Sequence, residues 1–145
     1  NNTEEGRPHP AAQPHTHNHT MSSAKLHTAA LRGDVVGVEE CLAAGMDVNL
    51  KDGGGWTPLY FACWNNKTEV VRVLLSAGAD PNIAINNGYT LLHWAAIKGY
   101  IEVARLLVAH GATVNAVTKD GDTPLHFACS NGYSLMAVWL CAAGG

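Results

Sequence analysis

Apolar residues recur along this chain at helical spacing, in a short stretch followed by a longer one. Between Thr68 and Ala77, the positions Val70, Val71, Leu74 and Leu75 form one apolar stripe of a helix. The stretch before it, Leu59 to Cys63, is shorter, and its small residues would let a neighbouring helix approach closely. The pattern predicts a short helix paired with a longer one, and Ile101 to His110 repeats the longer member.

Residues that start and stop helices flank these stretches. Thr57-Pro58 and Thr123-Pro124 predict helix starts, because threonine caps a helix and proline fits its first position. The short helices are expected to end in left-handed backbone, at Gly33, Asn66, Gly99 and Gly132, and the longer ones at Gly45, Gly78 and Gly111. Three pairs between these units favour tight hairpin turns: Gly54-Gly55, Asn87-Gly88 and Asp120-Gly121.

All of these features recur every 33 residues. Four series of one residue type keep this register: Leu26, Leu59, Leu92 and Leu125; Ala29, Ala62, Ala95 and Ala128; Gly45, Gly78, Gly111 and Gly144; and Asn49, Asn82 and Asn115. A fixed period of this length is the signature of a repeat architecture, in which each unit packs against its neighbours.

The repeated unit carries a recognisable motif. The segment Thr123-Pro124-Leu125-His126-Phe127-Ala128 resembles the T-P-L-H-x-A signature of the ankyrin repeat, and Thr57 to Ala62 and Thr90 to Ala95 are variants of it. Gly78-Ala79-Asp80-Pro81-Asn82 resembles the family's G-A-D-x-N ending. The resemblance covers residues 22–145 and implies an all-α solenoid of stacked helix-turn-helix units with hairpin loops. The repeats would span about 22–51, 52–84, 85–117 and 118–145.

The first twenty residues differ from the rest. They hold four of the eight histidines and three prolines but almost no aliphatic residues, so they cannot bury enough surface to fold. We expect residues 1–20 to be a disordered leader or tag, with the folded domain over 21–145. The run from His15 to His19 could act as a flexible metal chelator, but no cysteine or carboxylate accompanies it.

Composition and charge narrow the classes of function. The net charge of −3 argues against binding to nucleic acid through phosphate contacts. The longest apolar run, Leu135 to Ala143, is far shorter than the roughly 20 residues of a membrane helix, so no membrane partner is expected. The four cysteines form no C-x-x-C pair, and we interpret all of them as buried thiols: Cys41, Cys63, Cys129 and Cys141. This use of cysteine favours an intracellular protein, cytoplasmic or nuclear.

The two ends of the array are expected to differ. The first repeat presents charged residues, whereas the last predicted helix, from Ser134 to Cys141, contains none. A helix that is apolar on all sides is usually buried. We therefore expect either that the chain is a fragment of a longer array, truncated at its C-terminal end, or that another molecule covers this end, including a second copy by self-association.

The pattern offers no catalytic constellation. His27, His93 and His126 occupy one repeat position, so they lie a repeat apart and cannot converge on a metal or a nucleophile. The family resemblance implies that each ties a neighbouring hairpin by hydrogen bonds. Asp47 and Asp80 are also repeat-equivalent and suit a role in turns. We expect no enzyme activity, no cofactor and no metal site.

Large aromatic residues that the repeat does not require are the candidates for binding. The resemblance implies that hairpin tips and short helices line a concave binding surface. Residues expected there are Trp56, Trp64, Asn65, Tyr89, Trp94, Ile97, Lys98 and Asp122. Aromatic anchors with a sparse polar rim are typical of protein-binding hot spots. For Phe61 and Phe127, core packing is an equally good interpretation.

The leading hypothesis is a non-catalytic protein-interaction module of unidentified partner. Two alternatives stay open: a structural spacer within a larger protein, and stacking of nucleic-acid bases or a small ligand on the tryptophans. In some members of the family, asparagines in an Asp-Val-Asn context are hydroxylated, and Asn49 matches that context.

Overall fold

The computed structural model describes residues 18–144, with side chains described from Lys25 onward. The expected disordered leader therefore falls largely outside the described residues, as does the metal-chelating role of the histidine run. The first helix begins at Asn18, ahead of the boundary that the composition suggested at Met21.

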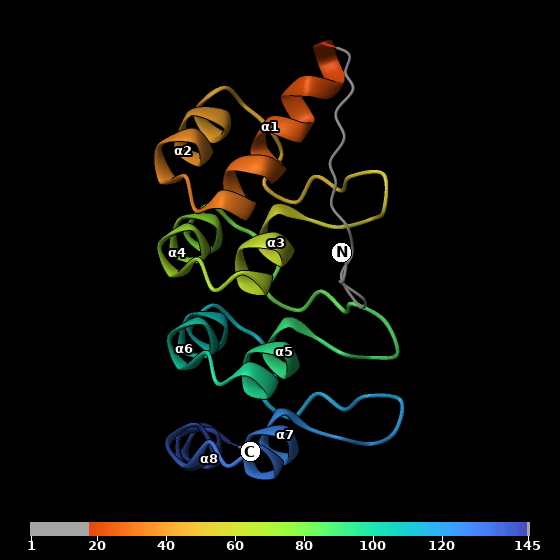
Figure 1. The fold of residues 1–145 in the computed structure, drawn as a ribbon, viewed down its shortest axis with the longest axis vertical. Coiled ribbons are helices and arrows are strands. Elements are labelled where there is room, and N and C mark those ends of the chain that lie inside the picture. Colours follow the sequence, from red (N-terminus) through yellow and green to blue (C-terminus); the bar gives the residue numbers. More distant parts are fainter. Residues whose placement is uncertain (1–17, 145) are drawn as a thin grey trace.

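The described residues form eight α-helices arranged as four pairs. Each pair has a first and a second helix: α1 (Asn18–Arg32) with α2 (Val35–Ala43), α3 (Pro58–Trp64) with α4 (Thr68–Ser76), α5 (Leu91–Lys98) with α6 (Ile101–Ala109), and α7 (Pro124–Ser130) with α8 (Ser134–Ala142). Figure 1 shows the first helices in one column, the second helices in another, and the connecting hairpins projecting to one side. The chain is an all-α repeat solenoid, as predicted.

The helix boundaries follow the residues that predicted them. The hydroxyls of Thr57, Thr90 and Thr123 each accept a hydrogen bond of 3.3 Å from a backbone N–H in the first turn of their helix. Asn66 ends the first helix of its pair with φ of 57°, the left-handed conformation that glycine adopts at the equivalent places.

The core runs through the stack rather than gathering at one centre. Leu26, Leu59 and Leu92 are fully buried, but the equivalent Leu125 in the last pair is only half-buried. The expectation that all four cysteines are buried was wrong for two of them. Cys41 and Cys63 are buried, whereas Cys129 and Cys141 are exposed. Both exposed thiols lie in the last pair, where no described helix packs on the far side.

Asparagines tie each pair to the next at the turns that follow the second helices. Asn49 Nδ2 donates to Gly78 O at 3.4 Å, and Asn49 Oδ1 accepts from Asp80 N at 2.9 Å. Asp47 and Asp80 shape these turns, because each carboxylate accepts a 2.9 Å bond from the backbone two residues later. The predicted turn role of these two aspartates is confirmed. Asn49, the residue in the hydroxylation context, therefore holds two neighbouring turns together.

Candidate functional site

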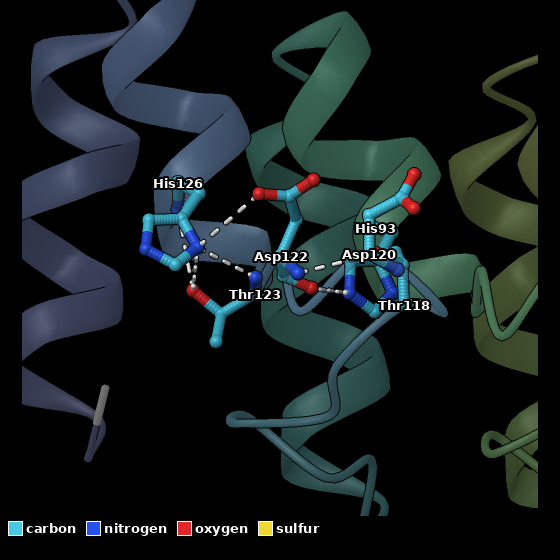
Figure 2. Close-up of polar contacts among 6 residues, drawn as sticks. All are labelled: His93, Thr118, Asp120, Asp122, Thr123 and His126. Carbon is cyan, nitrogen blue, oxygen red and sulfur yellow. Dashed lines mark hydrogen bonds and ion pairs between the residues drawn. The ribbon is translucent and has the colours of Figure 1, made fainter.

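His93 is the best-defined polar link between repeats. Its Nδ1 accepts a hydrogen bond of 3.0 Å from Thr90 N. Its Nε2 donates to Asp122 O at 2.9 Å in the next hairpin (Figure 2). The ring is fully buried, and burial lowers the pKa of His93 below its ordinary value of 6.5. A neutral imidazole satisfies both bonds, so His93 acts as a structural tie.

The equivalent histidines differ in how far they reach. His27 Nε2 lies 2.8 Å from Leu50 O and 3.1 Å from Trp56 O, so it also holds the following hairpin. The hydrogen bonds described for His126 remain at the start of its own helix, where Nδ1 accepts from Thr123 N at 2.8 Å. Asp122 Oδ1 lies 3.8 Å from the same nitrogen. The tie implied by the family resemblance is therefore present at His27 and His93 but not at His126.

The hairpin that receives His93 is ordered by its own side chains. Thr118, which is buried, accepts hydrogen bonds at Oγ1 from Asp120 N at 3.2 Å and from Asp122 N at 3.1 Å (Figure 2). Lys119 N donates to Asn87 O at 2.8 Å, which joins this hairpin tip to the preceding one. The tips therefore present a fixed edge beside the first helices.

Next to this edge lies a continuous run of rings, which we call the aromatic row. It consists of the rings of Trp56, Tyr60, Trp64 and Trp94, with Lys98 at its end. Tyr60 is buried, the three tryptophans are half-buried, and Lys98 is exposed. Trp56 stacks on Tyr60 at 4.4 Å, Tyr60 lies 5.4 Å from Trp64, and Trp64 stacks on Trp94 at 4.0 Å and 5°. Lys98 Nζ lies 5.1 Å from the centroid of the Trp94 ring, within the range of a cation–π contact. The row thus crosses from α3 to α5.

Trp94 has a feature that packing alone does not explain. Its Nε1 is buried and has no hydrogen-bond partner among the described residues. An unpaired buried N–H costs about 1–3 kcal/mol. The equivalent residues of the neighbouring repeats, Phe61 and Phe127, fill this position without such a group. Trp94 therefore carries a polar N–H at a position where the neighbouring repeats have a phenyl ring.

The remaining aromatic candidates pack inward to different degrees. Phe61 is buried in the core and lies edge-on to His27, so the core-packing interpretation holds for it. Tyr89 and Phe127 are half-buried, with ring centroids 5.6 Å apart, and both lie beside His93. Tyr89 therefore supports the histidine tie while keeping part of its ring exposed.

The polar candidates separate into structural and exposed groups. Asn65 is half-buried, and its side-chain amide donates to Leu31 O at 3.0 Å. Asn131, at the equivalent position of the last repeat, donates to Ile97 O at 3.1 Å in the same way. One N–H of the Asn65 amide therefore links its repeat to the preceding one. Lys98 occupies this repeat position in α5 and is exposed over Trp94 instead.

Ile97 and Asp122 complete the predicted set. Both are half-buried, and the backbone carbonyl of each accepts a bond from within the fold, while 41% of the Asp122 side chain stays exposed.

Tyr60 was not singled out from the sequence, although it joins Trp56 to Trp64. The spacing of four residues between Tyr60 and Trp64 was the available signal, because residues four apart share one face of a helix.

The arrangement offers shape and apolar contact. Over residues 18–144, the structure shows no cluster of three or more His, Cys, Asp or Glu side chains able to hold a metal ion. None of the helices in that part of the chain combines the length and apolar character needed to cross a lipid bilayer. Stacked helix pairs joined by histidine and asparagine ties define a helical repeat protein.

Comparison with known proteins places it more closely. The sequence matches a family profile described as ankyrin repeats (3 copies) over residues 11–85, and another described as ankyrin repeats (many copies) over residues 65–108 and 92–140. The chain belongs to the ankyrin repeat family. Repeats of this family generally mediate protein–protein interaction.

The similar curated proteins match over part of this chain. Protein phosphatase 1 regulatory subunit 12A of Mus musculus is 45% identical over 49 residues, which are 34% of this chain and 5% of that protein. Protein phosphatase 1 regulatory subunit 27 of Homo sapiens is 36% identical over 56 residues, or 39% of this chain and 36% of that protein. Ankyrin repeat and SAM domain-containing protein 3 of Homo sapiens is 44% identical over 50 residues, which are 34% of this chain and 8% of that protein. The matches span well under two thirds of each relative.

Proposed function

We propose that this chain is a non-catalytic protein-binding module whose contact surface consists of the accessible members of the aromatic row, Trp56, Trp64, Trp94 and Lys98, together with the adjacent hairpin tips. Tyr60 is buried and supports the row from below. The observation that carries the proposal is the stack of Trp64 on Trp94, extended by Lys98 on one side and by Tyr60 and Trp56 on the other. Stacked rings are already ordered, so these side chains would lose little conformational entropy when a partner binds. Tryptophan and tyrosine are also enriched among the residues that dominate binding energy.

The proposed surface has a defined composition. Trp56, Trp64, Tyr89, Trp94 and Ile97 are half-buried and would supply apolar contact. Lys98 and Asp122 would give the partner direction at opposite ends of the surface, through a cation and a carboxylate. Asn65 donates one amide hydrogen to Leu31 O, and its second N–H and its Oδ1 would serve as polar contacts for the partner.

The relatives that are named as regulatory subunits fit a role in binding rather than in catalysis. We propose an intracellular location, which agrees with the free thiols Cys129 and Cys141.

The proposal is tested by comparing the proteins that the chain retains from a cell extract with those retained by matched variants. Trp64→Ala/Trp94→Ala removes the stack, and Lys98→Glu reverses the exposed charge without touching the core. Arg105→Ala is the control, because Arg105 is exposed on α6, away from the short helices. Circular dichroism of each variant verifies the fold.

A partner retained by the wild type and by Arg105→Ala, but lost from the other two variants, would support the assignment. With that partner purified, we expect Trp64→Ala or Trp94→Ala to weaken binding by about 2 kcal/mol, roughly thirtyfold in Kd. A folded double variant that retains the same partner at the same affinity would rule out the aromatic row.

A further inference from the structure

The first and second helices of the pairs differ in charge. Within residues 18–144, the first helices contain no aspartate or glutamate, and their charged residues are all cations: Lys25, Arg32 and Lys98. The second helices carry every glutamate of that range: Glu39, Glu40, Glu69 and Glu102. The helical face that bears the aromatic row is therefore positive, although the whole chain has a net charge of −3.

Two of these cations share one repeat position at the end of the aromatic row. Arg32 is the last residue of α1, Lys98 is the last residue of α5, and both are exposed. Trp64 ends α3 between them, because α1, α3 and α5 pack side by side (Figure 1). Lys67, in the turn after α3, extends back to the end of α1, since a Cβ built on Gly33 would lie 2.9 Å from Lys67 Cδ. Cations of both neighbouring repeats therefore flank Trp64 along the stack.

The carboxylates of the described residues leave these cations unpaired. The close contacts between basic and acidic side chains in that part of the chain lie on α4 and beside His126. Asp34 follows Arg32 closely in the chain, but its Oδ1 accepts a hydrogen bond of 3.0 Å from Gly37 N and caps α2. The other aspartates of residues 18–144 lie in the hairpins and in the turns after the second helices. The cations at the end of the row are therefore available to a group outside the chain.

The fold does not require a cation at this repeat position. Asn65 and Asn131 occupy it after α3 and α7, and their amides donate to carbonyl oxygens of the preceding repeat. A cation at the C-terminal end of a helix offsets part of the helix dipole, but α3 and α7 form with a neutral amide there. Lys98 instead holds its Nζ 5.1 Å from the centroid of the Trp94 ring. The charge at this position is thus directed to the binding face.

We propose that the partner segment bound by the aromatic row is an acidic peptide in extended conformation, an inference that rests on the proposed function. One carboxylate of the segment accepts from Lys98 Nζ, a second lies at Arg32, and apolar side chains between them contact Trp64 and Trp94. Adjacent helices lie about 8–10 Å apart, so two repeats separate the cations by on the order of 16–20 Å. An extended chain rises about 3.3 Å per residue, so carboxylates about five or six residues apart reach both cations.

A single-stranded nucleic acid is the other polyanion that binds to aromatic rings and cations. Trp64 and Trp94 stack on each other at 4.0 Å and 5°, so the two ring faces that meet are closed to a base. The hairpin beside the row carries the carboxylates of Asp120 and Asp122, which repel a continuous phosphate backbone. A peptide can place its carboxylates at the cations alone, so the charges favour a peptide.

Selection from a phage-displayed library of random peptides tests the proposal, with the full chain as bait. Peptides that the wild type retains at physiological salt should contain Asp and Glu at roughly twice their frequency in the unselected library or more. One retained peptide is then synthesised and its Kd is measured. Arg32→Asn/Lys98→Asn should weaken binding about fivefold or more, and added salt should weaken it as well. Since asparagine occupies this repeat position after α3 and α7, the variant should keep the fold.

Arg72→Asn/Arg105→Asn is the matched control, because it removes the same charge from exposed positions on α4 and α6. It should leave the Kd of the peptide unchanged. Retention of no peptide, retained peptides without an excess of Asp and Glu, or equal weakening by the two asparagine variants would overturn the proposal. Tighter binding of oligothymidylate than of the acidic peptide would overturn it too.

The variant Trp64→Ala/Trp94→Ala separates this inference from the proposed function. Acidic peptides that this variant no longer retains would support both. Peptides that it loses but that carry no excess of Asp and Glu would leave the proposed function standing and overturn the acidic partner. Peptides that it retains as well as the wild type does would overturn the proposed function, and the acidic partner with it.

Discussion

His93 offers the sharpest test of how the repeats are held together. His93→Ala removes the bond from Nε2 to Asp122 O and the bond from Thr90 N to Nδ1. Each is worth about 1 kcal/mol net, and the cavity left by a fully buried ring adds about another 1 kcal/mol. We expect the variant to lose about 3 kcal/mol of unfolding free energy.

His126→Ala is the control, since this histidine caps its helix in the same way but has an exposed side chain and no described bond to a neighbouring hairpin. It should cost about 0.5–1.5 kcal/mol. Urea unfolding followed by circular dichroism measures both variants. Equal losses at His93 and His126 would refute the reasoning, because the inter-repeat bond and burial would then contribute nothing.

Three further outcomes follow from the same contacts. Because the pKa of His93 is lowered in the folded state, the stability that the neutral ring contributes should be fully present above about pH 6.5 and should decline as the pH falls. In a plot of the urea unfolding midpoint against pH, His93→Asn should make this decline shallower. Trp94→Phe removes the N–H that has no described partner and keeps an aromatic ring, so the free energy of unfolding measured in urea should stay the same or rise by up to about 1 kcal/mol. A fall in this free energy of more than about 2 kcal/mol would contradict the expectation. Gly132→Ala should lower the free energy of unfolding by about 1 kcal/mol, because Gly132 has a φ of 75°. Gly99→Ala, with the same φ and with the Tyr133 ring against the added methyl group, should lower it by about 1 kcal/mol more; thermal unfolding measures both variants.

The fold was predictable because each repeat contains residues that mark where its helices start and end. Thr57-Pro58 marks a helix start and Asn66 a helix end, and both behave as the local chemistry requires. The 33-residue register then places equivalent residues next to one another without any knowledge of tertiary contacts. Local propensity and global packing agree in this fold, so the helices and their stacking can be predicted from the sequence.

The errors come from the end of the array and from contacts across repeats. Cys129 was interpreted as buried by analogy with Cys63, but burial depends on the following repeat and not on the residue itself. His126 shares its motif with His93 yet has no described partner beyond its own helix start. The bond from the Asn65 amide to Leu31 O, which joins two repeats, also has no signal in the sequence, and the partner-binding role of Asn65 stays a prediction. A sequence pattern specifies the repeat but not what each neighbour contributes.

Site-specific photo-crosslinking tests the central claim, that the aromatic row is the protein-binding face. A photoreactive phenylalanine analogue replaces Lys98, which lies over Trp94, or Arg105, which is exposed on α6. Irradiation in a cell extract should give protein adducts from position 98 and few or none from position 105. Adducts from position 105 alone, or equally from both positions, would contradict the account.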